Sequence, residues 1–172
     1  MKKIGLYFLF ILLIVVVGCT KKSEQVVELK LYPLNNLEGI ITLSNVQFDK
    51  EISSDGKGSL RITTTEPITI RLFEVGDIDV ENANLTYQAK IRTEDIDGKV
   101  YLEMYCCFTS KGEFFSRDIQ TPITGTTNWV TEETPFFLQK GENPDNVKLN
   151  LVIDGKGTVW IDDIKLLKGP LR

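Results

Sequence analysis

The feature that most constrains the fold is a strict alternation of apolar and polar residues, which repeats along most of the chain. Ser59–Thr63 and Ile68–Leu72 place apolar side chains at every second position, the period of a half-buried β-strand. The same period runs through further segments, and alanine, the strongest helix former, occurs only twice. We therefore expect strands also at 85–92, 100–108, 147–153 and 158–166, with shorter ones at 40–43 and 46–48.

Glycine-rich turns separate these segments. Ser54–Gly58, Asp97–Gly98, Ser110–Gly112 and Asp154–Gly157 supply the residue that best tolerates positive φ. Turn signals spaced about 8–12 residues apart are typical of antiparallel sandwiches. The sequence predicts an all-β fold, with one antiparallel β-sandwich of two sheets over residues 29–172.

Composition narrows the functions available to this chain. The 172 residues carry 20 Lys and Arg against 24 Asp and Glu, a formal charge of −4, which disfavours a nucleic-acid partner. Histidine is absent, so Ser-His and Cys-His nucleophiles and histidine-ligated zinc are excluded. We expect this chain to have no enzymatic activity and to require no cofactor.

The N-terminus has the layout of a secretion signal. Lys2 and Lys3 precede an apolar run from Ile4 to Val17, whose fourteen residues would span ~21 Å as a helix, less than the ~30 Å hydrocarbon core. Val16–Cys19 resembles the lipobox of bacterial lipoproteins, in which the peptide is cut before a cysteine that becomes acylated. The alternatives are an ordinary signal peptide with a chance cysteine and an uncleaved anchor.

This resemblance implies a bacterial lipoprotein with a signal peptide over 1–18, and a lipidated Cys19 and tether over 19–28. The lipid bilayer would be its partner, through the acyl chains on Cys19. Thr20, in place of the aspartate that marks inner-membrane retention, favours an outer-membrane location if the envelope has two membranes. The folded domain would then lie in the periplasm or outside the cell.

Two segments, 54–62 and 157–166, resemble the jelly-roll sandwiches of carbohydrate-binding modules of the galactose-binding-like type. Trp129 sits where those modules often open a strand with tryptophan, and the likeness covers about Glu38 to Lys168. The stretches 101–105 and 112–117 are also similar to uncharacterised bacterial lipoproteins of this size. The resemblance implies a binding module, although such sandwiches also occur without a sugar ligand.

Asp162 falls on the same side of its predicted strand as Trp160, Ile164 and Leu166, so we expect a buried carboxylate that needs compensation. In the modules that this chain resembles, the matching aspartate helps to bind a structural calcium ion. The resemblance thus implies calcium held by Asp162 with Glu38, Asp55 and Ser59. Backbone N–H groups of the loop 55–59 are the alternative partners for Asp162.

The opposite parity predicts a polar and aromatic outer face. If Val100, Leu102 and Met104 face the core, their neighbours face outward, and the same reasoning turns Phe73, Gln88, Lys90 and Arg92 outward. Aromatic planes beside guanidinium, amide and carboxylate groups suit sugar recognition. The candidate ligand-binding residues are Arg71, Tyr101, Glu103, Tyr105, Arg117 and Asn150.

Two alternatives remain open at this point. Pairing of Glu103 with Arg117 across strands could simply stabilise the sheet. The chain could also be a structural or assembly lipoprotein that docks onto an envelope protein. Glycoside cleavage is disfavoured, because Glu103 has no evident second carboxylate on its face.

For Cys106 and Cys107, on opposite sides of one strand, we expect a buried thiol and a more exposed thiol, with a vicinal disulfide as the alternative.

Overall fold

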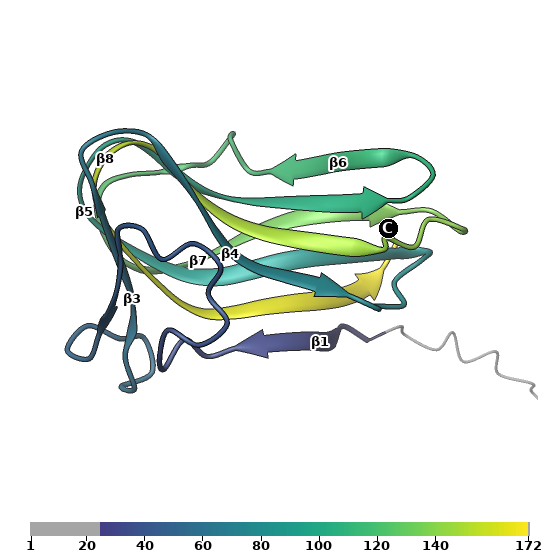
Figure 1. Cartoon of the computed structure of the whole chain (residues 1–172), viewed down its shortest axis with the longest axis horizontal. Coiled ribbons are helices and arrows are strands. Elements are labelled where there is room, and N and C mark those ends of the chain that lie inside the picture. Colours follow the sequence, from purple (N-terminus) through teal and green to yellow (C-terminus); the bar gives the residue numbers. More distant parts are fainter. Residues whose placement is uncertain (1–24, 172) are drawn as a thin grey trace, which may run out of the picture.

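The computed structural model describes residues 25–171, and these form an all-β sandwich, as predicted (Figure 1). No helix among the described residues is long and apolar enough to cross a membrane. Every strand pairing is antiparallel. The strands are β1 (Val27–Tyr32), β2 (Val46–Asp49), β3 (Ser59–Thr64), β4 (Ile68–Gly76), β5 (Ala83–Phe108), β6 (Gly112–Arg117), β7 (Ile123–Leu138) and β8 (Asn146–Pro170).

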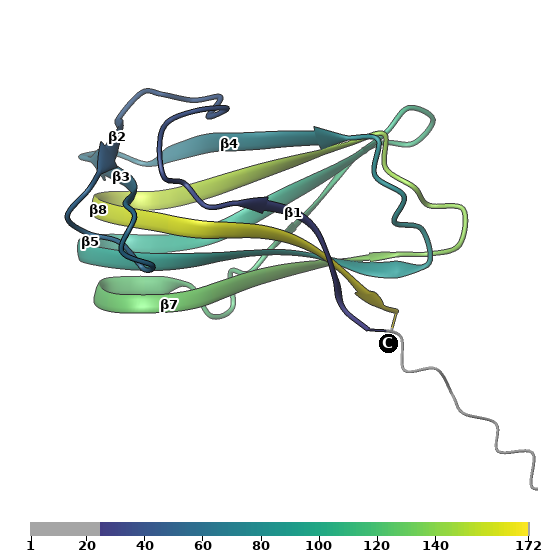
Figure 2. The same ribbon diagram turned by 90° about the horizontal axis from the view of Figure 1, so that it is seen from below.

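Two long strands, β5 and β8, form the middle of both layers. They pair along their whole length, from Ala83 opposite Pro170 to Cys107 opposite Asn146, and both bend back at one end of the molecule (Figures 1 and 2). The first layer holds β2, β3, β1, the C-terminal half of β8, the N-terminal half of β5, and β7. The second layer holds β4, the N-terminal half of β8, the C-terminal half of β5, and β6. The two layers are thus parts of one hydrogen-bonded sheet, where two separate sheets were expected.

Glycine makes the bend possible. Gly98 lies opposite Gly155 at φ values of +136° and +153°, and a Cβ atom on Gly98 would lie 2.2 Å from the backbone oxygen of Asp154. Only glycine fits such a close approach of two backbones. The Asp97–Gly98 and Asp154–Gly157 segments were expected to separate strands. They instead bend two continuous strands, because their glycines let the backbone turn while cross-strand pairing continues.

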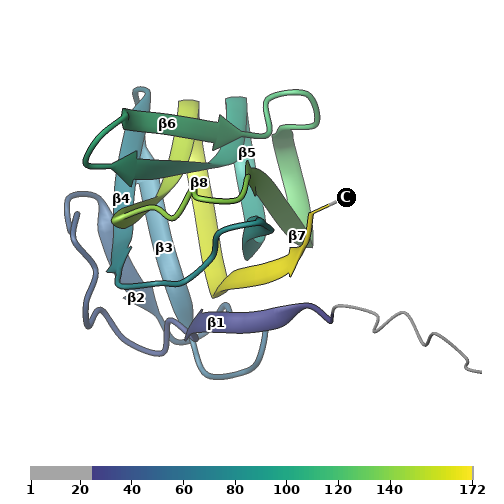
Figure 3. The same cartoon turned by 90° about the vertical axis from the view of Figure 1, so that its right-hand side faces the viewer.

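Figure 3 shows the two layers from the end opposite the bend. The core lies between these layers. Leu102, Met104, Leu149 and Leu151 point inward from the second layer, so the predicted parity of these strands is confirmed. Segment 33–45 covers one side of the core, where Leu34 and Ile40 are buried. Residues 40–43, expected to be a strand, belong to this covering segment and run beside β4, with the N–H of Thr42 donating to the carbonyl of Arg71 at 2.9 Å.

Two irregularities move side chains away from their predicted faces. The pairing of β4 shifts between Arg71 and Phe73, so Phe73, expected outside, is buried and stacks on Tyr32 with ring centroids 3.7 Å apart. In β8, Asp163 adopts a φ of +51°, and the register against β5 shifts at the same point. Such bulges place neighbouring residues on the same face.

Because of the irregularity in β8, the predicted parity of the residues around Asp162 is wrong. Val159 and Ile161 join Ile164 and Leu166 in the core, whereas Trp160 faces outward beneath Arg92, whose Cζ lies 5.7 Å from the ring centroid. Trp160 is nonetheless only 3% exposed, and its indole N–H donates to Asp49 at 2.9 Å.

Candidate functional site

A row of polar side chains crosses the outer face of the second layer. Arg71 of β4 lies opposite Asn150 of β8, Asn150 lies opposite Glu103 of β5, and Glu103 lies opposite Arg117 of β6. Directly opposed residues of antiparallel strands present their side chains on the same face. Four of the six candidate binding residues therefore form one continuous row, on what we call the four-strand face.

Glu103 is the centre of this row. Its carboxylate accepts a hydrogen bond from the Asn150 amide at 3.2 Å and pairs with the Arg117 guanidinium at 3.8 Å. Glu103 and Asn150 are only 6% and 4% exposed, although the sequence predicted freely available side chains here. They lie on an outer face, where they contact one another and Glu103 also contacts Arg117. The Oδ1 atom of Asn150 is buried and has no hydrogen-bond partner.

An aromatic pair adjoins the row. Tyr105 lies opposite Phe115 of β6, with ring centroids 5.8 Å apart and a tilt of 53°. The Phe115 ring is 51% exposed, and the Arg117 guanidinium lies 4.2 Å from its centroid. The exposed ring and the guanidinium thus form a combined apolar and hydrogen-bonding surface next to Glu103.

An ion pair occupies the neighbouring positions of the same face. Lys148 of β8 binds Glu113 of β6 at 2.5 Å, and this pair lowers the pKa of Glu113 and raises that of Lys148. A hydrogen bond with the Cys107 thiol also lowers the pKa of Glu113. Neither residue was predicted as a binding candidate, because charged residues on a predicted outer face have no distinguishing pattern.

Tyr101, beside the row, and Arg71, at its end, lie at the margins of the face. Tyr101 is 8% exposed and borders a cavity of about 300 Å³ with Thr69 and Val152. Arg71 is directed to Glu74, with 3.2 Å between Nη1 and Oε1. The structure thus gathers Glu103, Tyr105, Arg117 and Asn150 closely, and places Tyr101 and Arg71 around them.

The predicted calcium ligands have other partners. Asp162 is completely buried, and its two oxygens accept hydrogen bonds from the N–H groups of Ser54 at 2.9 Å and of Asp163 at 2.8 Å. Burial raises the pKa of Asp162, and the nearby Asp55 adds to that shift. As the alternative to calcium, the N–H groups of residues 55–59 were predicted to be the partners of Asp162. The loop donor observed is Ser54, one residue earlier.

The other three residues do not complete an ion shell around Asp162. Asp55 receives hydrogen bonds from Ser53 and Lys57, Ser59 donates to the carbonyl of Ile52 at 2.6 Å, and Glu38 is exposed beside Asn36. Across residues 25–171, no group of three or more acidic or cysteine side chains could hold a metal ion. The donors around Asp162 are N–H groups, which do not bind a cation, and the calcium site stays a prediction.

The two cysteines of β5 are both free thiols, Cys106 buried and Cys107 partly exposed, as expected. Cys19, the predicted signal peptide and the first part of the predicted tether lie outside the described residues. Within them, β1 already begins at Val27, inside the range 19–28 expected to be tether.

Comparisons with known proteins indicate the class of fold. No protein-family model matches the sequence, and no curated protein matches it. Among solved structures, the chain is similar to a family 16 carbohydrate-binding module, with a TM-score of 0.53 and 14% identity over 71% of this chain and 84% of that one. It is also similar to a CBM22-1 xylan-binding domain from Paenibacillus barcinonensis, with a TM-score of 0.54 and 12% identity over 89% and 90% of the two chains.

A third structure shows how far this likeness extends. A Stig cyclase from Fischerella sp. TAU matches with a TM-score of 0.56 and 12% identity, over 83% of this chain and 85% of the cyclase. The chain thus has the jelly-roll sandwich fold of carbohydrate-binding modules, a fold that also occurs in an enzyme. At these identities the comparisons define the fold alone, and function has to be argued from the four-strand face.

Proposed function

We propose that this protein is a membrane-anchored, non-catalytic binding lipoprotein that recognises a carbohydrate or cell-wall glycan on the four-strand face. The observation that carries the proposal is the juxtaposition of the exposed Phe115 ring, 4.2 Å from the Arg117 guanidinium, with the Glu103–Asn150 pair. Sugars present apolar C–H faces together with hydroxyl groups, and this surface offers a partner for each.

The hydrogen bonds within the row support this role. Glu103 and Asn150 hold one another and Arg117 in place before any ligand arrives, so less side-chain freedom is lost on binding. Arg117 is partly exposed and retains N–H donors for hydroxyl groups. A carboxylate already engaged by an arginine and an amide suits hydrogen bonding to hydroxyls better than proton transfer in catalysis.

The location proposed for the protein follows from the N-terminal sequence. Acylation of Cys19 would hold the chain on a bacterial membrane, the outer one if the envelope has two, with the sandwich in the periplasm or outside the cell. A structural calcium ion at Asp162 belongs to the same set of proposals. Metabolic labelling with a fatty acid, compared between the natural chain and a Cys19→Ala variant, tests the anchor, and equal labelling would contradict it.

A glycan array probed with the purified protein, followed by calorimetric titration of any glycan it retains, tests the binding function. We expect Tyr105→Ala and Arg117→Ala each to weaken binding by about tenfold or more, equivalent to about 1.4 kcal/mol. Lys140→Ala, an exposed position outside the face, is the control and should bind as the natural protein does. Retention of no glycan, or unchanged binding by both face variants, would refute the proposal.

Exposed apolar side chains on and beside β6 favour a second candidate, a structural or assembly lipoprotein that docks onto an envelope protein. Phe114, Phe115 and Ile119 are 48%, 51% and 54% exposed. Crosslinking in cells would then recover one envelope protein, and a Phe114→Ser, Ile119→Ser double variant would lose it without loss of glycan binding. Recovery of that protein equally by both chains would contradict this candidate.

A further inference from the structure

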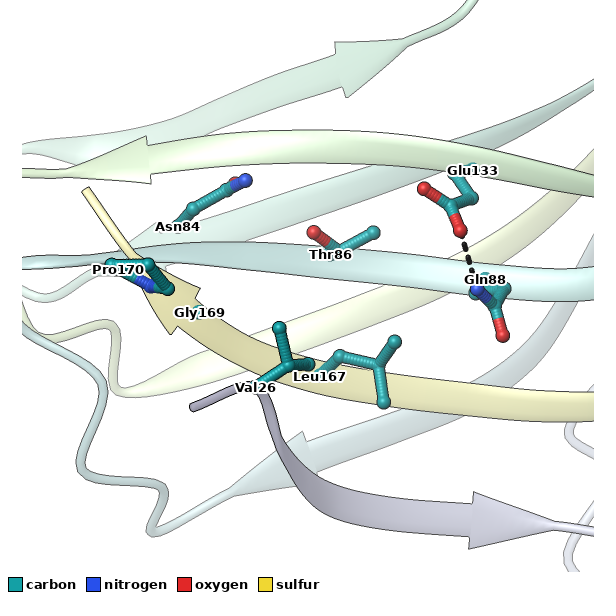
Figure 4. Close-up of a pocket in the computed structure, with 8 residues that line it drawn as sticks. All are labelled: Val26, Asn84, Thr86, Gln88, Glu133, Leu167, Gly169 and Pro170. Carbon is teal, nitrogen blue, oxygen red and sulfur yellow. Dashed lines mark hydrogen bonds between the residues drawn. The ribbon is translucent and has the colours of Figure 1, made fainter. Parts of the chain in front are cut away.

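A groove lies on the outer face of the first layer, on the opposite side of the sandwich from the four-strand face. Figure 4 shows its lining, in which β5 provides the floor, β7 one wall, and Val26 with the end of β8 the other. Its volume is about 420 Å³, within the range of small-molecule sites in proteins. We call it the Gly169 groove, lined by Val26, Asn84, Thr86, Gln88, Glu133, Leu167, Gly169 and Pro170.

The floor is polar because β5 alternates there. Asn84, Thr86 and Gln88 point outward, whereas the residues between them are fully buried in the core. The Gln88 amide donates to the Glu133 carboxylate on β7, which fixes the amide across the floor (Figure 4). The Oδ1 atom of Asn84 is buried and has no hydrogen-bond partner. Two amides and a hydroxyl group therefore converge on one short stretch of floor.

Apolar surface borders this polar floor. Leu167 and Val26 form one side, and the missing side chain of Gly169 leaves room between them and Asn84. Phe137 of β7 lies opposite Asn84 in the pairing, so its ring shares this face, and it is 54% exposed. An exposed aromatic ring next to amide and hydroxyl groups offers both a stacking surface and hydrogen bonds.

The charge of the lining disfavours an anionic ligand. Among residues 25–171, no lysine or arginine lines the groove, and the only charged group in its lining is the Glu133 carboxylate. An anionic ligand would therefore meet a like charge in this lining, and Lys165, which lies opposite Gln88 on the same face, is already paired with Glu28 and Asp163. A neutral ligand rich in hydroxyl groups has no such conflict.

The strands under the groove also argue against an extended peptide. β5 and β8 are paired on both sides here, β5 with β7 and β8, and β8 with β5 and β1. Their backbone groups are already engaged, so an added peptide strand would find no free ladder on the floor. The groove can offer side-chain groups only, which suits a polyhydroxylated ligand.

We propose that the Gly169 groove is a second binding site, for a neutral saccharide. It goes beyond the glycan site proposed on the four-strand face and does not depend on it, since no residue is shared between the two. The chain would then contact saccharide on both outer faces of the sandwich.

Filling the groove tests the proposal. In Gly169→Leu the new Cβ atom would lie 3.6 Å from Val26 Cγ2 and 3.9 Å from the Asn84 carbonyl oxygen, ordinary contacts that allow folding, while the rest of the side chain occupies the groove. The probes are cellohexaose, xylohexaose and chitohexaose, with trigalacturonate as the anionic control. The readout is the shift of the Asn84 and Gln88 side-chain amide signals in ¹⁵N-resolved NMR spectra of the full chain.

We expect at least one neutral hexasaccharide to shift these signals, the anionic probe to leave them in place, and Gly169→Leu to weaken the effect by tenfold or more. Gly169→Ala should retain most of it, and Gln88→Ala, which leaves the groove open, should weaken it. Arg117→Ala should leave the groove titration unchanged, so failure of the four-strand site is seen separately at the Asn150 amide. Any one of four results would overturn the proposal. These are no shift with any neutral probe, an equal shift with the anionic probe, an unchanged titration in Gly169→Leu, and a shift only with an uncharged peptide.

Discussion

The phenol of Tyr87 lies in the middle of the core, and its hydroxyl group has no hydrogen-bond partner. The residue is fully buried on β5, between the layers, and burial raises its pKa. A buried hydroxyl group without a partner costs about 1–3 kcal/mol of stability. Tyr87→Phe removes this group and keeps the ring, so the variant should be more stable than the natural chain.

The size of the gain follows from two opposing terms. Removal of one oxygen atom leaves a void of roughly 10 Å³, which costs about 0.2–0.3 kcal/mol at about 24 cal/mol per Å³. The net stabilisation is then about 0.7–2.8 kcal/mol, a rise in Tm of about 2–8 °C at about 3 °C per kcal/mol for a domain of this length. The ring itself keeps its neighbours, and no other loss is expected.

Urea unfolding followed by tryptophan fluorescence measures this change, and the slope with urea should stay constant. Tyr105→Phe, which removes a hydroxyl group from the partly exposed outer face, is the control and should change stability by less than about 0.5 kcal/mol. A Tyr87→Phe variant that is less stable than the natural chain, or equally stable, would refute the reasoning. The hydroxyl group would then have a partner, such as a buried water molecule.

Three further predictions concern other parts of the molecule. Burial raises the pKa of Asp162 above 3.8, so the folded chain holds its proton to higher pH, and the stability that this carboxyl contributes is present in acid and lost as pH rises through the raised pKa. The unfolding free energy of the natural chain should therefore fall relative to Asp162→Asn as the pH rises above 3.8 in chelator. A bound calcium ion would reverse this trend when calcium is added. Gly98→Ala should cost at least about 2 kcal/mol more than Gly112→Ala in urea unfolding, because both have positive φ but only the Gly98 Cβ would collide with backbone, and equal costs would contradict the close approach. Burial raises the pKa of the Cys106 thiol to about 12, so thiol titration should label Cys107 in the native protein and both in denaturant; labelling of neither in denaturant would indicate a disulfide.

Most of the strands were predictable because alternation is a direct consequence of one buried face. Leu102 and Met104 point inward and Tyr105 is partly exposed on the outer face, as the pattern of β5 predicts. The fold class follows from the same signal, and the predicted turns at 54–58 and 110–112 do separate strands. Their role at Gly98 and Gly155 was not predictable, because a turn and a bend within a continuous strand use the same residues.

The departures arise where the period of two is broken. A bulge adds one residue to a strand without a distinctive sequence, so Phe73 moved inside and Trp160 moved outside. Burial within the candidate site was also hidden from the sequence. Alternation gives the face on which Glu103 and Asn150 lie, but their mutual packing depends on strand order, which brings β8 between β4 and β5.

The bend in β5 also separates residues that were expected on one outer face. Gln88 was expected on the same outer face as Arg117, but the bend in β5 carries it to the opposite layer, where it lines the Gly169 groove. A long strand that serves both layers cannot be recognised from local pattern, since each half reads as a strand of its own.

The continuity of β5 and β8 has a consequence for how the molecule opens. Neither layer can detach as an independent unit, because each half of these strands is covalently continuous with a half in the other layer. Backbone amides in the middle of both layers should therefore exchange with solvent only when the whole domain unfolds, whereas β1 and β6, each paired along a single edge, can fray locally. The two outer faces thus share one cooperative unit.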